Sequence, residues 1–233
     1  MAAKLATQKY PKSLLHVVYC DVRESEHPDQ ERFLLKVQDW IDHPIEIIKS
    51  TDYQSIDEVF ERTRYMAGIY GARCTIEMKK IPRFRYQQAD DIHLFGLTWD
   101  EEKRIERFTA DHPDLYLDWI LRDQQYKKEK CLQMVRLAGI DLPAMYKLGY
   151  KNNNCIGCVK ATSAKYWNKI RKDFPGVFAK RAAQSRELGV RLTRVRGERV
   201  FLDELPADYL LGEEMENISC GPDCSKDEVS DNG

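Results

Sequence analysis

Short apolar runs alternate with amphipathic segments over the first 140 residues of the chain. Unbroken apolar runs are typical of buried strands, whereas apolar residues spaced three or four positions apart predict helices. In residues 28–41, for example, Phe33, Leu34, Val37 and Ile41 share one helical face. The pattern predicts strands at 14–22, 45–50, 91–98 and 115–123. It predicts helices at 1–9, 28–41, 55–66, 74–80, 99–108 and 124–139, and Pro82 is expected to end the helix at 74–80.

This alternation predicts an α/β fold for residues 1–140. Strands that alternate with helices form parallel sheets, because each parallel connection needs a crossover helix. We therefore expect a Rossmann-like parallel sheet with helices on both faces.

The alternation stops after residue 140, which indicates a second unit at 141–212. Residues 142–158 have the character of a loop, 166–174 and 177–188 are helical in pattern, and 190–205 resembles a hairpin turning at Arg196 and Gly197. We expect this C-terminal subdomain to carry a cysteine-rich metal site. Residues 213–233 are acidic and contain Gly, Ser and Asn, so we expect a partly disordered tail.

Composition narrows the class of protein. The 233 residues carry a net charge of −1, and no apolar run reaches the length that a membrane span requires. The N-terminal segment lacks the apolar core of a secretory signal, so we expect a cytoplasmic protein without a membrane partner. Basic residues predominate at 160–199 and acidic residues at 203–233. The basic segment suits phosphate, DNA or tRNA, although a solvated helix face is the commoner explanation.

The seven cysteines are an odd number, and a reducing compartment disfavours disulfides. Cys155 and Cys158 form a CxxC motif preceded by Gly149 and a run of asparagines. Such turn-forming residues let two thiolates converge on one ion, so we favour metal or cluster ligation over a thioredoxin-like redox pair or an accidental spacing. A four-coordinate site needs two further ligands, and the chain offers Cys74, Cys131, Cys220 and Cys224. We expect Cys131, Cys220 and Cys224 to complete the site. Burial in a helix is an equally good explanation of Cys131, and Cys20 has the pattern of a core residue.

Two basic segments are candidates for anion binding. Arg73 and Cys74 stand at the start of the predicted helix, which also contains Lys79 and Lys80, and a helix start with cations lowers a thiol's pKa and attracts anions. Arg104 follows a predicted strand, at the edge where ligands bind in parallel sheets. Ordinary amphipathic helices with i,i+3 and i,i+4 ion pairs explain both segments without a ligand. Three of the five histidines precede prolines and none has a ligand spacing with another, which disfavours a His-based zinc enzyme.

Several segments in order resemble the sulfonucleotide reductase-like group, the relatives of phosphoadenosine phosphosulfate (PAPS) reductase. This group belongs to the adenine nucleotide alpha hydrolase, or PP-loop ATP pyrophosphatase, superfamily. The segments are HVVYCDV followed by EHPDQERF, RCTIEMKKIP, HLFGLTWDEEKRIERF and, most specific of all, LPAMYKLGYKNNNCIGCVK. The resemblance implies a Rossmann-like sheet with an adenine nucleotide, ATP or PAPS, at the carboxyl ends of its strands. Asp21 and Arg104 are the expected nucleotide or phosphate contacts.

The resemblance also implies a [4Fe-4S] cluster, since cluster-bearing members join an upstream cysteine to a CxxC over a spacing like that from Cys74 to Cys155. Three features depart from the family pattern. Thr75 stands where a second cysteine is usual, and Ser219-Cys220-Gly221 only faintly matches the catalytic C-terminal signature. The family's Ser-Gly-Gly phosphate loop is missing, because the first glycine is Gly68.

In the family, a central strand of the sheet leads into this phosphate loop. We therefore expect that the chain begins late relative to the family. We also expect that the strands on either side of the absent one lack a parallel partner. The leading hypothesis is a PAPS reductase-like protein that reduces an adenylated or sulfated nucleotide or transfers its sulfur, with an iron–sulfur cluster or zinc as cofactor. Its catalysis depends on the loop that this chain lacks. The alternatives are a sulfurtransferase that modifies DNA or tRNA, and a non-catalytic binding or regulatory protein stapled by its metal. The oligomeric state is left open.

Overall fold

The computed structural model describes residues 1–68, 71–209 and 218 as a mixed arrangement of helices and short strands. The longer helices are α1 (Ala2–Lys9), α2 (Asp29–Ile41), α3 (Ile56–Thr63), α6 (Glu102–Asp111), α8 (Lys128–Leu137), α10 (Ala164–Asp173) and α11 (Pro175–Glu187). The short helices are α4 (Arg73–Thr75), α5 (Ile81–Tyr86), α7 (Ile120–Asp123) and α9 (Ala144–Lys147). The strands are β1 (Val17–Cys20), β2 (Ile45–Ile48), β3 (Ala67–Gly68), β4 (Gly71–Ala72), β5 (Ile92–Leu94), β6 (Tyr116–Asp118), β7 (Thr193–Val195) and β8 (Glu198–Val200).

The strands of the first unit form two separate parallel pairs where a single sheet was expected. Strand β1 pairs with β2 and β5 pairs with β6, and each pair is a two-stranded sheet of its own. In the first pair Val17 lies opposite Ile45, and in the second Ile92 lies opposite Tyr116. The parallel βα order is therefore confirmed, and the sheets are small. Strand β5 is shorter than predicted and ends at Leu94, and the next residues, Phe95 and Leu97, bury their side chains in a cluster with Phe108.

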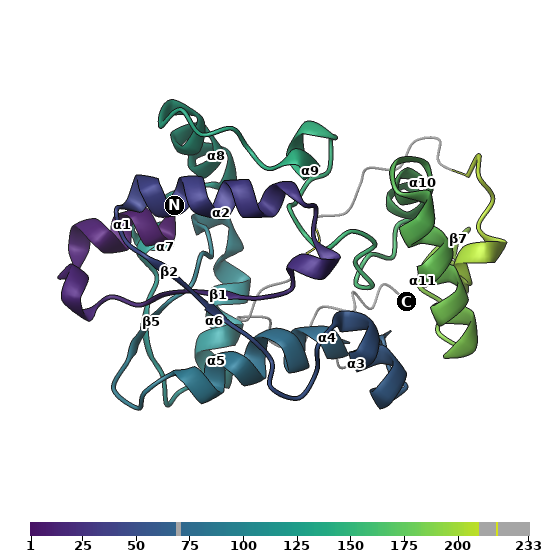
Figure 1. Ribbon diagram of the computed structural model, residues 1–233, viewed down its shortest axis with the longest axis horizontal. Coiled ribbons are helices and arrows are strands. Elements are labelled where there is room, and N and C mark those ends of the chain that lie inside the picture. The colour runs from purple at the N-terminus through teal and green to yellow at the C-terminus, as the bar shows by residue number, and fades with distance from the viewer. Residues whose placement is uncertain (69–70, 210–217, 219–233) are drawn as a thin grey trace.

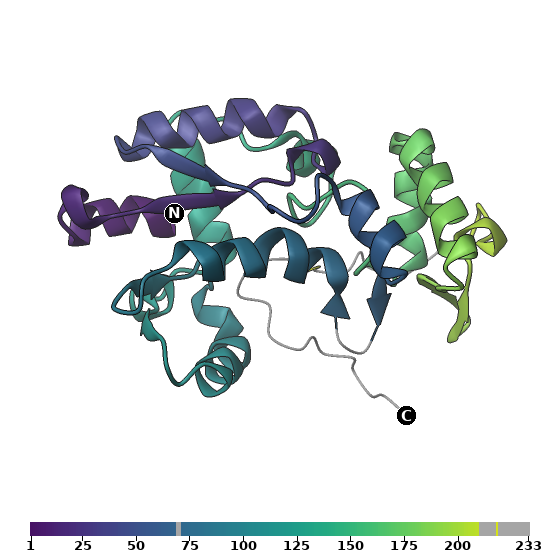
Figure 2. The same cartoon turned by 60° about the horizontal axis from the view of Figure 1, so that its bottom comes forward.

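Helices cover both sides of the β1–β2 pair. Helix α2 lies on one side, and the helical stretch from α4 to α5 lies on the other (Figures 1 and 2). Helix α5 contacts β2 directly. Of the apolar face predicted for α2, Ile41 is 1 % exposed at the end of the helix, and Phe33 packs against the cluster of Val135, Ile140 and Leu142.

The helix predicted to end at Pro82 continues past it, so that prediction was wrong. Helix α4 runs into a π-helical turn at Ile76–Lys80 and then into α5, in which Pro82 occupies the first turn. Proline has no N–H, and its ring clashes with the carbonyl four residues earlier in a regular α-helix. That residue is Met78, inside the wider π turn. The π turn lets the chain remain helical through Pro82.

The predicted C-terminal helices and hairpin are confirmed. Helices α10 and α11 pack on each other, and β7 pairs with β8 in an antiparallel hairpin. At its turn Arg196 has φ 52° and Gly197 has φ 87°. Positive φ at both central residues is the requirement of a type I′ two-residue hairpin turn, and the Gly at the second position meets it without strain.

The largest hydrophobic cluster joins residues from both sides of the expected boundary between 140 and 141. It contains Phe60 of α3 and Met78 of the π turn together with Cys155, Trp167 of α10 and Phe178 of α11. Phe60 and Trp167 are both 0 % exposed. Burial on this scale is the dominant stabilising term in folding, so the second unit shares its core with the first. Among the described residues, no helix combines the length and apolar character needed to cross a lipid bilayer.

Candidate functional site

Three cysteines from distant parts of the chain line one small cavity. Cys74 comes from α4, and Cys155 and Cys158 come from the loop between α9 and α10. All three are buried, with exposures of 9 %, 7 % and 7 %. The remaining wall consists of apolar residues, the backbone of Gly157, the polar residue Thr75 and two cations, Lys79 and Arg181. The free space is close to what a single water molecule needs.

Backbone hydrogen bonds hold the CxxC loop in place. The N–H of Ile156 donates to the carbonyl of Ser25 over 2.8 Å, which ties the loop to the segment after β1. The N–H of Cys158 donates to the hydroxyl of Tyr166, also over 2.8 Å. Tyr166 is 5 % exposed, and burial raises the pKa of its hydroxyl well above the ordinary value. The loop therefore presents both thiols from a fixed backbone.

Gly157, inside the CxxC motif, allows α11 to pack directly on the loop. Its φ is 68°, in the left-handed region that favours glycine. A Cβ at this position would lie 2.8 Å from Cγ1 of Val177 and 3.4 Å from Cγ of Arg181. The motif thus needs glycine both for its backbone conformation and for its contact with α11.

The asparagines before the motif serve as connectors. Asn153 Nδ2 donates to Gln30 Oε1 of α2 over 2.6 Å. Asn152 Nδ2 and Asn154 Nδ2 both donate to the carbonyl of Ile218, over 3.2 Å and 2.7 Å. Ile218 is itself 8 % exposed and belongs to the same cluster as the cysteines. This run of amides fastens the loop to Gln30 of α2 on one side and to Ile218 on the other.

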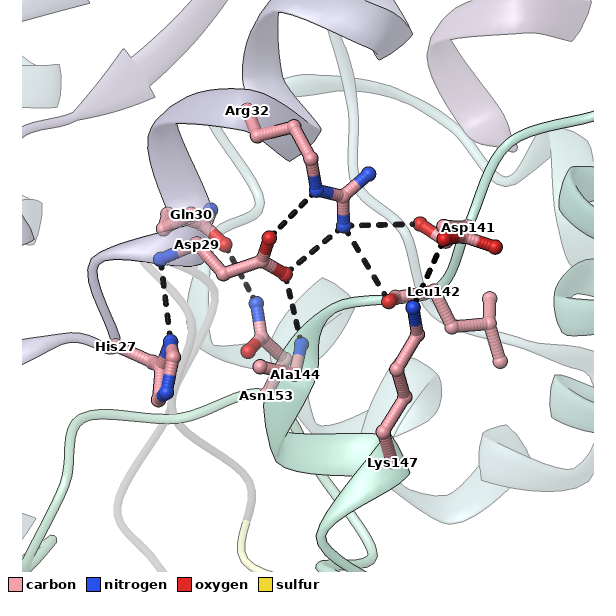
Figure 3. A network of polar contacts seen from close by, with 9 residues as sticks. All are labelled: His27, Asp29, Gln30, Arg32, Asp141, Leu142, Ala144, Lys147 and Asn153. Atoms are coloured by element: carbon pink, nitrogen blue, oxygen red, sulfur yellow. Dashed lines mark hydrogen bonds and ion pairs between the residues drawn. The ribbon is translucent and has the colours of Figure 1, made fainter.

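A second network ties the start of α2 to the segment that leads into the loop (Figure 3). Asp29 Oδ2 accepts a hydrogen bond of 2.9 Å from the N–H of Ala144, and Asp29 also pairs with Arg32. Arg32 in turn donates to the carbonyl of Asp141 over 3.2 Å. His27 Nδ1 accepts from the N–H of Asp29 over 3.1 Å. The His-Pro helix start that resembled a family motif has a structural role here.

Of the residues near Cys74, Lys79 lines the cavity, whereas Arg73 and Cys20 do not. Arg73 forms an ion pair of 2.7 Å with Glu77, which is 5 % exposed, so this arginine is balanced by a carboxylate of its own helix. Lys79, in the same π turn as Glu77, lines the cavity. The Sγ of Cys20 lies 3.6 Å from the carbonyl of Lys79, and burial raises the pKa of this thiol. Cys20 is therefore packed beside the site as a core residue and does not line it.

Arg181 of α11 brings a buried positive charge to the cavity. Its residue exposure is 4 %, and its Nη1 pairs with Asp57 of α3. Burial raises the pKa of Asp57, but the charge of Arg181 and hydrogen bonds from Lys180, Arg181 and Gln184 outweigh it and lower the pKa to about 2. The Asp57 carboxylate is thus fully ionised at neutral pH and joins α3 to α11.

The cysteine donors suit a thiophilic ion in their chemistry. Thiolates bind zinc and iron–sulfur clusters, and Lys79 and Arg181 offset the negative charge that thiolates bring. In the part of the chain that the structure describes, no three His, Cys, Asp or Glu side chains are close enough to form a metal-binding group. The three cysteines line one cavity, but they are not close enough together to coordinate one ion in the described structure.

Both residues expected to contact a nucleotide are engaged within the protein. Asp21 follows β1 directly and pairs with Arg23 at 2.8 Å and Lys49 at 3.4 Å. Hydrogen bonds from Arg23 lower the pKa of its carboxyl. Arg104 of α6 pairs with Glu101 at 2.7 Å. Neither residue lines the cysteine cavity.

The other expected ligands lie apart from the cavity or outside the described residues. Cys131 packs in a different cluster, against Leu5, Ile120 and Leu121, and burial raises the pKa of its thiol. Cys220 and Cys224 fall outside the residues that the structure describes. Cys74, which was not among the three ligands expected to complete the site, is the cysteine that lines the cavity with Cys155 and Cys158.

Several cations of the basic segment at 160–199 have partners inside the protein. Arg171 donates to the carbonyls of Leu202 and Leu205. Arg186 pairs with Asp203 at 2.6 Å and with Glu204 at 3.0 Å. These contacts join helices α10 and α11 to residues 202–205 within the second unit.

In comparisons with family models, curated proteins and solved structures, no match to the chain was found.

Sequence reasoning missed three residues that build the site: Asp57, Tyr166 and Arg181. They lie on α3, α10 and α11, helices in which charged and aromatic residues are common. Only the Gly of the CxxC motif carried a local signal, because a glycine between two ligand candidates indicates a tight turn.

Proposed function

We propose that the protein holds a metal centre, an iron–sulfur cluster or zinc, at the cavity of Cys74, Cys155 and Cys158. The observation that carries this proposal is that Cys74 lines the same cavity as the CxxC motif, although the two lie far apart in the sequence. Burial disfavours the thiolate, the form that binds metal, and the cations Lys79 and Arg181 in the cavity wall offset that effect.

A fourth ligand comes from the cysteines after Ile218 in this proposal. Asn152 and Asn154 hold the carbonyl of Ile218 beside the CxxC loop. Two residues of chain extend over at most about 7 Å, so Cys220 is the first candidate by connectivity. Cys131 is no longer favoured, because it packs in another cluster.

The wider function we propose is that of a PAPS reductase-like protein, which binds an adenylated or sulfated nucleotide and reduces it or transfers its sulfur. The support is the ordered resemblance in the sequence, the parallel βα pairs and the position of Asp21 directly after β1. Ligands bind at the carboxyl ends of strands in open parallel sheets. Asp21 and Arg104 are the proposed nucleotide contacts, and a nucleotide would have to compete with their present ion pairs.

The metal proposal is tested on protein purified without added metal, by measuring iron, zinc and acid-labile sulfide per chain. We expect close to one zinc per chain, or iron and sulfide in equal amounts. Cys74→Ser and Cys155→Ser are expected to lose most of that content. Cys131→Ser is the matched control, because it changes a half-buried cysteine of another cluster. Wild-type protein with neither metal, or equal losses in all three variants, contradicts the proposal.

The nucleotide proposal is tested separately by calorimetric titration with ATP and with PAPS. Arg104→Met is expected to weaken binding at least tenfold, on the order of a charged hydrogen bond to phosphate. Arg107→Met on the same helix is the control. Metal content without affinity for either nucleotide would leave a non-catalytic protein stapled by its metal.

A further inference from the structure

We propose that Arg181 is the charge-compensating donor of the cysteine cavity, and that it favours an anionic, thiolate-bound metal over a neutral occupant. The inference deepens the proposed metal site and rests on it for the identity of the occupant. The contribution of Arg181 itself is argued from the geometry of α3, α11 and the cavity wall.

The guanidinium of Arg181 is buried and only partly satisfied. Its Nη1 donates to Asp57 Oδ1 and to Gln184 Oε1. Its Nε is also buried, and among the residues that the structure describes this atom has no hydrogen-bond partner. Arg181 lines the cavity together with the cysteines. Buried donors are nearly always paired in folded proteins, so this N–H needs an acceptor.

The position of Arg181 relative to the CxxC loop is fixed. The stem of the side chain packs at the turn, where a Cβ on Gly157 would lie 3.4 Å from Arg181 Cγ. The far end of the guanidinium is held by Asp57, and α3 and α11 set the distance between the two. Because both ends of the side chain are held, its Nε has a fixed position, and a hydrogen bond from it to an acceptor costs little conformational entropy.

The side chains of the cavity wall offer two kinds of acceptor, the cysteine sulfurs and the hydroxyl of Thr75, and of these only a thiolate carries the negative charge that matches Arg181. Metal ligation requires cysteines to lose their protons to solvent, which leaves negative charge in an apolar cavity. Outer hydrogen bonds to ligating groups hold them in orientation and strengthen metal binding. Arg181 supplies one such bond and a positive charge. Asp57 partly neutralises that charge, so the pair sets how strongly the site attracts an anionic centre.

This arrangement predicts opposite effects of two neighbouring substitutions. Arg181→Met removes the charge and the Nε donor, and is expected to weaken Zn²⁺ binding by about tenfold, as outer-sphere changes do. Asp57→Asn leaves Arg181 with its full charge and is expected to tighten binding roughly threefold. A purely structural role would weaken binding in both. Arg181→Lys keeps the charge without the Nε donor and is expected to lie between Arg181→Met and the wild type.

The measurement is a competition of metal-stripped, reduced protein against a chromophoric chelator with Zn²⁺ at one fixed pH. Lys180→Met is the matched control, because Lys180 also pairs with Asp57 but is not a wall residue of the cavity. Circular dichroism and urea unfolding confirm that each variant is folded at the assay temperature. Unchanged affinity in folded Arg181→Met, or weakening in both Arg181→Met and Asp57→Asn, overturns the proposal.

A second measurement keeps this proposal separate from the metal site itself. The alkylation rates of the apo protein with anionic iodoacetate and neutral iodoacetamide are compared at the same pH. Their ratio reports the local charge, because the fraction of reactive thiolate cancels. The ratio is expected to fall in Arg181→Met and to rise in Asp57→Asn. A wild type that binds no zinc would refute the metal site, and an unchanged ratio would refute the role of Arg181.

Discussion

Arg181 on α11 and Asp57 on α3 form an ion pair that joins the two units of the protein beside the cysteine cavity. The arginine side chain is 5 % exposed and that of the aspartate 21 %. Lys180 and Gln184 also reach Asp57. The carboxylate of Asp57 on α3 thus accepts hydrogen bonds from three side chains of α11.

Acid should weaken the fold through Asp57. Its pKa in the folded protein is lowered from 3.8 to about 2. A lowered folded pKa means that the stabilisation is present above the unfolded pKa and is lost as pH falls through the folded value. Asp57 is expected to contribute about 2 kcal/mol at neutral pH that disappears between roughly pH 4 and pH 2. Urea unfolding across this range should show a shallower loss of stability in Asp57→Asn, and equal slopes would refute the assignment.

Gly157→Ala should destabilise the protein more than an alanine at another left-handed glycine. At Gly157 the new methyl group meets Val177 at 2.8 Å and the φ of 68° is strained for alanine. Gly189 has φ 69° with nothing within 4 Å, so Gly189→Ala carries only the backbone cost. We expect the free energy of unfolding, measured with denaturant, to fall by about 1 kcal/mol in Gly189→Ala and by about 2 to 4 kcal/mol in Gly157→Ala. Equal losses would show that α11 does not press on the CxxC turn.

Asp29→Asn should loosen the connection between α2 and the segment before the loop. The substitution weakens the pair with Arg32 and the hydrogen bond from the N–H of Ala144. We expect a loss of about 1 kcal/mol and faster hydrogen exchange at Ala144. Asp39→Asn is the control on the same helix, because Asp39 is 71 % exposed and its contact with Lys36 is 4.0 Å long. Protection of Ala144 equal to that of the wild type would contradict the role of Asp29.

Tyr10→Phe should separate α1 from β6. The Tyr10 hydroxyl donates to Asp118 Oδ2 over 2.5 Å, and Asp118 is 8 % exposed at the end of β6. Removing this donor leaves a buried carboxylate with fewer partners. We expect the free energy of unfolding, measured by thermal denaturation, to fall by about 1 to 2 kcal/mol, which is what a hydrogen bond to a charged group contributes. Asp123→Asn is the control, because its carboxylate is 52 % exposed beside Arg122. A Tyr10→Phe melting temperature equal to that of the control would show that the bond is not stabilising.

Hydrophobic periodicity predicted the local elements well because it reports a property of each segment by itself. The helix at 28–41 and the hairpin turning at Arg196 and Gly197 are where the pattern placed them. Pro82 misled because a proline rule for regular α-helices does not anticipate a π turn, which forms only in the packed chain. The expected single sheet likewise depends on pairing between distant strands, which no local pattern encodes.

The cysteine site was predicted in part. The CxxC motif carried its own signal, whereas the choice between Cys74 and Cys131 as its neighbour depended on how helices far apart in sequence come together. Arg181 could not be singled out among the many basic residues of its segment, because its burial arises from contacts with α3 and with Gly157. Spacing identifies ligands that are close in the chain and leaves the distant ones open.

The shared core has a consequence for any attempt to divide the protein. A cut between residues 140 and 141 would separate Phe60 and Met78 from Trp167 and Phe178, which belong to one cluster. Each fragment would expose a broad apolar surface and would aggregate unless the other were supplied at the same time. The two units are therefore halves of one cooperative structure, and co-expressed fragments should reassemble through the walls of the cysteine cavity itself.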